Sequence, residues 1–409
     1  MKPDLAAAMR RATEATRAGD TSAASRIIRD ALSGHGPEDD RHSAAPGAAA
    51  APDGFAGPTL DLSANGDSTA PGTRAGAPPR PEQWRRPRRP LDEVVQLLSR
   101  GGAVGLRPGP GSPGSRVPRA HVGVAEGAAF ATRAFSCPAG ARDYKLYRPA
   151  SAPERPRALV VMLHGCQQDP DDFAVGTGMN DLAEAEGVLV AYPSQPGSAN
   201  GAGCWNWFHP GHQTRNAGEP AIIAGITREL MDEFGLERDQ VFVAGLSAGG
   251  AMAVVMGQTY PDLYAGVGAH SGLPYRAASD VVTAFAAMRG QAADRSRSPA
   301  ATDHFRAPMR TIVFHGSADG TVHPSNGEMI ANALVEAGAP AVSHGRSAGG
   351  RAYTIGVVSG AGGVPIMEHW IVDGAGHAWA GGSDAGSFTD PKGPDASREM
   401  LRFFLAGQA

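Results

Sequence analysis

The sequence predicts an α/β protein with a mostly parallel sheet and helices on both of its faces. Apolar runs bounded by Gly or Pro recur from about residue 129 onward, as in RALVVMLHG (157–165) and MRTIVFHG (309–316). Such runs are typical of strands that are buried on both faces of a sheet. Segments with helical spacing of apolar residues lie between these runs. Because strands alternate with helices, a parallel sheet is expected.

The composition divides the 409 residues into three parts. Residues 37–128 are rich in Ala, Pro, Gly, Ser and Arg, with too few large apolar groups to offset the entropy of ordering. A disordered linker is therefore expected there, interrupted by a short helix near 91–100. Residues 1–36 show helical apolar spacing and predict a small helical hairpin. Residues 129–409 are ample for one hydrophobic core and form the predicted main domain.

Charge and hydropathy indicate which kinds of partner and which location the sequence favours. The net charge of -4 gives no case for nucleic acid, and the Arg-rich stretch at 80–90 is interpreted as a solvated tether. No apolar run approaches the ~20 residues of a transmembrane helix, so no membrane span is expected. The N-terminus lacks a secretory signal. A cytoplasmic location is predicted, with an extracellular one as the alternative, and a cytoplasmic protein would keep its three cysteines as free thiols.

Each predicted element of the main domain rests on a periodicity. Alternating apolar and polar residues predict antiparallel strands in ATRAF (131–135) and RDYKLYRP (142–149). Continuous apolar runs predict the inner strands, which are 157–165, 188–193, 240–245, 264–272, 309–316 and 366–374. Helical spacing predicts helices at 179–187, 219–234, 251–260, 279–289 and 397–406.

Two G-x-S-x-G motifs occur, and a chain with 55 glycines produces such motifs by chance. In VFVAGLSAGGAMAVV, Ser247 lies between an apolar strand and a helix. This context lifts a serine hydroxyl clear of the sheet and places a backbone N–H beside it. In GRSAGGRAYTIG, no apolar strand precedes Ser347 and no helix follows it. Ser247 is therefore the predicted nucleophile, and Ser347 is predicted to lie in a loop.

The acid that accompanies such a serine should follow it in the chain, just past a strand. Asp319 directly follows the strand MRTIVFHG and is the predicted acid. Asp303 precedes that strand and is poorly placed. Asp373 ends the next strand and is the rival candidate.

The base should lie in a loop between the last strand and the last helix. His377 in DGAGHAWAGG meets this requirement. His323 is only four residues from Asp319, so we expect it to line the pocket or to face solvent. His369 lies within a strand and is expected to be a hydrogen-bonded core histidine. In the implied chemistry, His377 takes the proton of Ser247, and Asp319 orients the imidazole.

An oxyanion hole requires two backbone donors. One is the N–H of Ala248, the residue after the predicted nucleophile. The other should come from the loop after LHG, which indicates Cys166. Cys166 would then act through its main chain and not through its thiol.

Six motifs occur in order over residues 129–407: LHGCQQ, GCWNWF, GLSAGGAM, HGSADGTV, GAGHAWAGG and GPDASREMLRFF. Together they resemble the polyhydroxybutyrate (PHB) depolymerase family of esterases, which belongs to the α/β-hydrolases and is close to bacterial feruloyl and acetylxylan esterases. The resemblance implies the triad Ser247, Asp319 and His377 and the Cys166 N–H in the oxyanion hole. It also suggests a bridge between Cys166 and Cys204, as in exported relatives.

The loop at 201–219 is the predicted place of substrate contacts. Trp205, Trp207 and Phe208 would be unfavourable to expose without a function, and their apolar faces suit a methyl-bearing or aromatic acyl group. The alternative is that some of them only cover the edge of the core. Trp379 is expected to pack beneath its loop. The sequence shows no metal-binding or cofactor-binding motif, and neither a metal nor a cofactor is predicted.

The resulting hypothesis is a serine esterase that cleaves short-chain polyhydroxyalkanoate (3-hydroxybutyrate) esters or oligomers through an acyl-enzyme. A feruloyl or acetylxylan esterase is the first alternative, because the same machinery serves any ester carbonyl. An alternative of another class is a granule-associated binding protein that uses its N-terminal region. Secreted polymer-degrading relatives carry an extra substrate-binding domain, and its absence here favours soluble oligomers or the surface of native polyhydroxyalkanoate granules.

Overall fold

The computed structural model describes residues 122–152, 154–291, 309–333 and 339–407. The predicted hairpin at 1–36, most of the predicted linker and its helix near 91–100 lie outside the described residues. Within the described part, no helix combines the length and the apolar composition needed to cross a bilayer.

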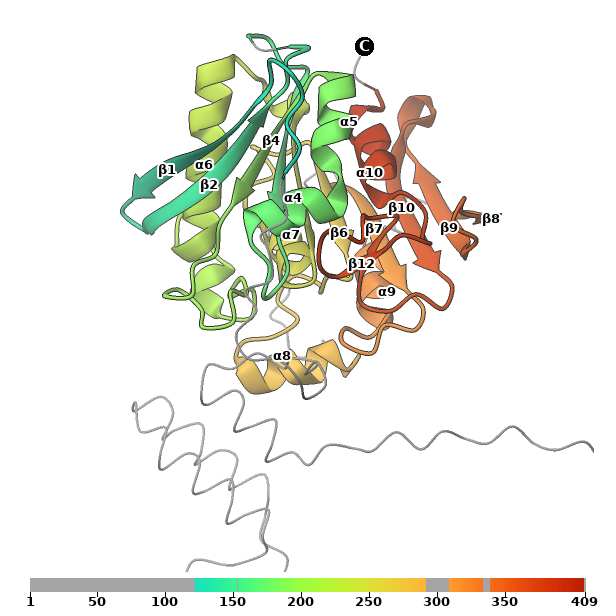
Figure 1. The fold of residues 1–409 in the computed structure, drawn as a ribbon. Helices are drawn as coiled ribbons and strands as arrows, with labels where there is room; N and C mark the ends of the chain where they lie inside the picture. The colour runs from blue at the N-terminus through green and yellow to red at the C-terminus, as the bar shows by residue number, and fades with distance from the viewer. Residues whose placement is uncertain (1–121, 153, 292–308, 334–338, 408–409) are drawn as a thin grey trace, which may run out of the picture. The chain divides into compact units, whose positions relative to one another are not determined.

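A ten-stranded sheet has the strand order β1-β2-β4-β3-β5-β6-β7-β10-β9-β8 (Figure 1). The inner strands from β4 to β10 pair in parallel, and the pairs at both edges are antiparallel. The strands are β1 (Ala129–Cys137), β2 (Gly140–Arg148), β3 (Ala158–Leu163), β4 (Val188–Pro193), β5 (Val241–Leu246), β6 (Gly266–His270), β7 (Arg310–Gly316), β8 (Ala341–Arg346), β9 (Ala352–Ser359) and β10 (Pro365–Val372). A separate small pair is formed by β11 (Trp379–Ala380) and β12 (Thr389–Asp390).

Helices cover both faces of this sheet. One layer contains α4 (Pro170–Thr177), α5 (Met179–Glu186) and α10 (Ala396–Leu405), which lie in front of the sheet in Figure 1. The other layer contains α6 (Gly218–Phe234) and α7 (Ala248–Thr259). Two further helices follow strands of the second half, α8 (Val281–Met288) after β6 and α9 (Ser325–Asn332) after β7.

The alternation of side chains along β3 explains why a continuous apolar run forms a strand here. Leu159, Val161 and Leu163 join a core cluster with residues of α6 and α7. Val160 and Met162 join the cluster that contains residues of α5 and α10. All five side chains are fully buried. Since each such burial contributes about 1.5–3 kcal/mol, both faces of the strand hold the layers together.

The structure confirms the predicted class and adds elements that the periodicities did not indicate. Among them are α4, α9, β8, β9 and the small pair of β11 and β12. Strand β8 is almost wholly exposed, so its sequence carries little apolar alternation. Each of the two helices contains a glycine, Gly176 in α4 and Gly327 in α9, and glycine is a poor helix former.

Candidate active site

Ser247 occupies the tight turn between β5 and α7. Its backbone is left-handed, with φ 58° and ψ -119°, and its N–H donates to the carbonyl of His270 at 2.8 Å. The flanking glycines make this turn possible. A Cβ at Gly249 would lie 1.9 Å from the Leu163 carbonyl oxygen, and one at Gly245 would lie 2.4 Å from the backbone of Gly249. The sequence therefore folds into a strand–turn–helix unit that presents this serine.

Asp319 and His377 meet in loops that follow β7 and β10. The two side chains are joined by a 2.7 Å hydrogen bond between His377 Nδ1 and Asp319 Oδ2. The other carboxylate oxygen accepts the backbone N–H groups of Thr321 and Val322, each at 2.9 Å. Burial by itself would raise the pKa of Asp319, but hydrogen bonds from His315, His377 and Val322 hold it well below its usual range. Asp319 is thus a carboxylate at neutral pH, able to stabilise an imidazolium.

Ser247 and His377 line the same cavity, which has a volume of about 450 Å³. Because His377 Nδ1 is hydrogen-bonded to Asp319, the Nε2 atom is the nitrogen left to exchange a proton with the serine. The predicted nucleophile and the predicted base therefore border one cavity, and the predicted acid is hydrogen-bonded to the base.

Two backbone donors adjoin the same cavity, at Cys166 and Ala248. Ala248 is the first residue of α7, where an N–H has no partner within the helix. The neighbouring amides of Gly165 and Gln167 are hydrogen-bonded, to Gln168 Oε1 and to the Ala202 carbonyl. No acceptor for the Cys166 N–H is found in the described part of the chain. Both predicted oxyanion donors thus border the space in front of Ser247.

Cys166 and Cys204 form a disulfide. The expectation of free thiols is therefore wrong for these two residues, while Cys137 is free. The bridge suggested by the family resemblance is present. It joins the loop that carries the predicted oxyanion donor to the loop that carries the aromatic residues.

The aromatic loop contributes unequally to the cavity. Trp207 and Phe208 line it, with their rings edge to face at 5.7 Å. Trp205 is fully buried and packs at 5.8 Å from the ring of His164 in the core. His323 is exposed and borders a different hollow. The loop therefore folds Trp205 inward and Trp207 toward the cavity, and His323 faces solvent, which was one of the two placements expected for it.

The rival candidates lie away from this arrangement. Asp373 is exposed, and Asp303 lies outside the described residues. Ser347 lies in the turn between β8 and β9, where its Oγ donates to the carbonyl of Lys392. His369 is on β10 as expected, but its Nε2 is buried without a hydrogen-bond partner among the described residues.

Trp379 packs beneath the His377 loop, as predicted. Its side chain is 1% exposed and stacks on His270 at 5.1 Å. Its indole N–H donates to Ser397 Oγ on α10.

Three further histidines at the ends of parallel strands support the site. His164, after β3, accepts the N–H of Gln195 at its Nε2. His270, the last residue of β6, accepts the N–H of Ala380, three residues past His377. Burial, with smaller contributions from neighbouring histidines, lowers the pKa of His270 to about 3, so this ring is neutral. His315, near the end of β7, contacts Asp319 and Val322 in the loop that follows this strand, which we call the acid loop. The repeated pattern of a histidine after an apolar run, in VVMLHG, VGAHSG and TIVFHG, was the available sequence signal.

A buried carboxylate holds the aromatic loop in place. Glu219, which is 1% exposed, accepts both the backbone and the side-chain N–H of Asn206, at 2.8 and 2.6 Å. Gln195 donates to the same carboxylate, and it donates to the Cys204 carbonyl as well. Asn206 lies between the two tryptophans, so Glu219 fixes which of them faces the cavity.

The parallel sheet and the serine at the sharp turn after β5 define the class of this protein: it is an α/β-hydrolase. The model of the Esterase PHB depolymerase family matches residues 142–350, just over half of the chain. The chain therefore belongs to that family.

Individual relatives agree with this assignment. The chain is 34% identical to poly(3-hydroxyalkanoate) depolymerase C of Paucimonas lemoignei over 239 residues, which are 56% of this chain and 55% of that protein. It is 29% identical to feruloyl esterase B of Neurospora crassa over 46% of this chain and 67% of that protein. Among solved structures, an acetyl xylan esterase from Aspergillus awamori superposes with a TM-score of 0.54 at 20% identity, over 67% of this chain and 98% of that one. The chain thus spans about half the length of the depolymerase it matches, and the last likeness concerns the fold alone.

Proposed function

We propose that this chain is a serine esterase that hydrolyses short 3-hydroxyalkanoate esters or oligomers through an acyl-enzyme. The observation that carries the proposal is the hydrogen-bonded pair Asp319–His377 bordering the cavity into which Ser247 is presented. Family membership supports an ester as the substrate.

The residues perform complementary parts of the reaction. Ser247 Oγ attacks the ester carbonyl carbon while its proton passes to His377 Nε2. The resulting oxyanion accepts the N–H groups of Cys166 and Ala248, each worth about 3 kcal/mol in the transition state. The C–O bond to the alcohol then breaks, and the alcohol takes the proton from His377. Water attacks the acyl-enzyme by the same sequence and releases the acid.

The lining of the cavity favours an aliphatic acyl chain. Beside the aromatic pair, apolar side chains of α8 and of neighbouring segments line it: Leu246, Leu273, Val281, Phe285 and Met288. Burial of a methyl-bearing hydroxyacyl unit against such side chains makes the free energy of binding more favourable. The name of the depolymerase relative is consistent with this substrate class.

A carbohydrate-linked ester, acetyl or feruloyl, is the second candidate. It is favoured by the 29% identity with a feruloyl esterase and with a probable acetylxylan esterase A of Aspergillus fumigatus. A sugar would have to remain outside the apolar part of the cavity and contact its polar rim, where Gln167, Asn200 and Thr321 lie.

Attachment to polyhydroxyalkanoate granules is proposed as a further property. Exposed apolar residues at the cavity mouth, Val281 at 45% and Phe388 at 39%, would suit a polyester surface. The cytoplasmic location remains a prediction. The Cys166–Cys204 bridge supports its extracellular alternative, because disulfides persist in oxidising compartments.

Hydrolysis of p-nitrophenyl butyrate and of 3-hydroxybutyrate dimer and trimer tests the proposal. Replacing Ser247 by Ala should lower kcat by about 1,000-fold or more. The matched control, Ser347→Ala, should retain full activity, because this serine lies in the β8–β9 turn. Cleavage of the simple ester without cleavage of the oligomers would favour sugar-linked esters. An active Ser247→Ala enzyme would refute the assigned nucleophile.

A further inference from the structure

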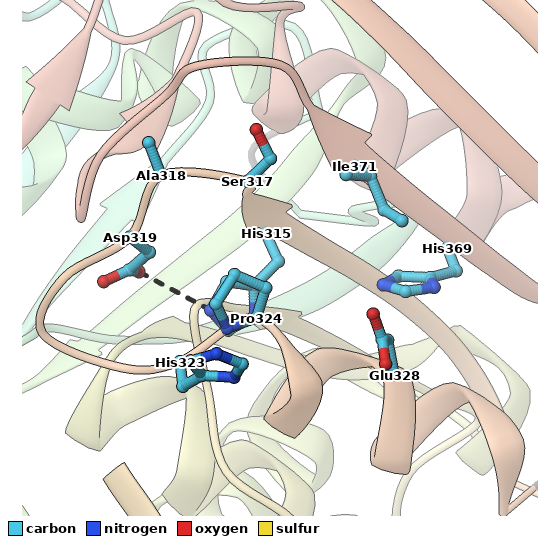
Figure 2. A pocket seen from close by; sticks show the side chains of 9 residues that line it. All are labelled: His315, Ser317, Ala318, Asp319, His323, Pro324, Glu328, His369 and Ile371. Atoms are coloured by element: carbon cyan, nitrogen blue, oxygen red, sulfur yellow. Dashed lines mark ion pairs between the residues drawn. The ribbon is translucent and has the colours of Figure 1, made fainter. Parts of the chain in front are cut away.

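A second hollow, of about 460 Å³, is lined by residues of β7, β10 and α9 and of the loop after β7 that carries Asp319. Figure 2 shows His315, His323 and His369 around it, with the contact between His315 and Asp319 dashed. In the described residues, no group of three or more His, Cys, Asp or Glu side chains is arranged to hold a metal ion.

His315 is the one of these histidines that touches the predicted triad. It is fully buried, and its Nε2 lies 2.9 Å from the carbonyl oxygen of Val322. A carbonyl oxygen only accepts, so Nε2 carries the hydrogen. The same N–H lies 3.5 Å from Asp319 Oδ2, the oxygen that accepts from His377. The Nδ1 atom of His315 has no hydrogen-bond partner among the described residues.

Val322 is hydrogen-bonded to both Asp319 and His315. Its N–H donates to Asp319 Oδ1, and its carbonyl accepts from His315. Fixing the carbonyl of Val322 therefore fixes the amide that orients the carboxylate. The partial positive charge of this N–H also lies near Oδ2, at an Nε2–Oδ2 distance of 3.5 Å, and offsets part of the negative charge there.

We propose that His315 is a positioning residue for the acid of the triad. It fixes the conformation of the turn from Asp319 to Val322, and it offsets part of the negative charge that the Asp319 carboxylate presents to His377. The inference rests on the proposed function, since it assigns a role relative to the same triad. Apart from the Val322 carbonyl and the Asp319 carboxylate, the His315 side chain has no hydrogen-bond or ion-pair partner among the described residues.

Several other titratable groups surround His315 from each neighbouring element. They are Asp319 and His323 from the acid loop, Glu328 from α9, His369 from β10 and His270 from β6. His369 provides a matched control. It lines the same hollow and its buried Nε2 has no hydrogen-bond partner among the described residues, whereas the imidazoles that contact the Asp319 carboxylate are those of His315 and His377.

The test compares His315→Phe, His315→Gln and His369→Gln in the full chain. Phe keeps the ring but removes the donor, whereas the amide nitrogen of Gln can reach the position of Nε2. For His315→Phe we expect kcat to fall about 10- to 100-fold with KM changed less than about 2-fold, because a misplaced acid affects the transition state more than substrate binding. The acid limb of the kcat/KM profile should also move, because the position and the charge of Oδ2 set how strongly it stabilises the imidazolium of His377. His315→Gln should restore most of kcat, and His369→Gln should match the wild type.

Titration of Ser247 with a fluorophosphonate gives the fraction of folded enzyme, to which each kcat is normalised. A normalised kcat of His315→Phe equal to the wild type would overturn the inference. Equal losses in the Phe and Gln variants, with the pH profile unmoved, would show a purely structural role and overturn it as well. Full activity of Ser247→Ala would instead refute the proposed function itself.

Discussion

The tight turn at Ser247 requires the glycines that flank it, because a Cβ at either position would overlap backbone atoms. Gly249→Ala should destabilise the protein by about 3 kcal/mol or more, because its Cβ would lie 1.9 Å from the Leu163 carbonyl oxygen, and that atom belongs to a buried strand. Chemical denaturation followed by tryptophan fluorescence measures this change. Gly197→Ala is the control, because nothing lies within 4 Å of the added Cβ. Equal stability of the two variants would contradict the close packing of the turn.

We expect helix α8 to limit the length of the acyl chain, because it lines the cavity. Ala284, Phe285 and Met288 line the cavity, and the Met288 carbonyl is fixed by the N–H of His323 at 2.7 Å. Ala284→Phe should lower kcat/KM for p-nitrophenyl butyrate relative to the acetate by about 10-fold, because each displaced methylene is worth 1–3 kcal/mol. Val282→Phe is the control, since Val282 is 58% exposed on the same helix. Parallel changes with both esters would refute the role of α8.

The disulfide joins two loops that meet at the oxyanion position. Because it closes a sequence separation of 38 residues, its loss should lower stability by up to about 4 kcal/mol by the loop-entropy estimate. Cys204→Ala should therefore reduce both the melting temperature and kcat, as the Cys166 amide loses its anchor. Thermal melts and butyrate hydrolysis, with and without reductant, measure both effects. Cys137→Ser should leave them unchanged because this thiol is free; an unaffected Cys204→Ala would show that the bridge is dispensable.

At the scale of the whole molecule, buried neutral histidines tie stability to pH. Burial, more than the neighbouring charges, lowers the pKa of His270 to about 3 and that of His369 to about 4. Both values lie below the ordinary value of 6.5. Between the folded pKa of each ring and 6.5, the unfolded chain binds a proton that the folded chain does not. The free energy of unfolding therefore falls as the pH decreases below about 6.5.

Each of the two groups should contribute a slope of up to about 1.4 kcal/mol per pH unit in this window. Urea unfolding at pH 7, 6 and 5 measures the slope. His369→Phe should make it shallower. A stability that is constant from pH 7 to pH 5 would contradict the burial of neutral rings.

The inner sheet was predictable because each strand is buried on both faces. A continuous apolar run such as ALVVML leaves little choice of structure. Strands β8 and β9 were missed because β8 is exposed and β9 is mostly half-buried, so pairing of β9 with β8 and β10 defines this edge more than apolar burial does.

The sequence by itself determined the fold class, the inner strands and the candidates Ser247, Asp319 and His377, because apolar runs and the residues that end them are local properties. Only the tertiary structure decided which tryptophan faces the cavity, that Cys166 pairs with Cys204, and that His315 meets the acid loop. These outcomes depend on contacts between segments far apart in the chain. The direction of a side chain in a loop is set by such contacts, which no local pattern of residues encodes.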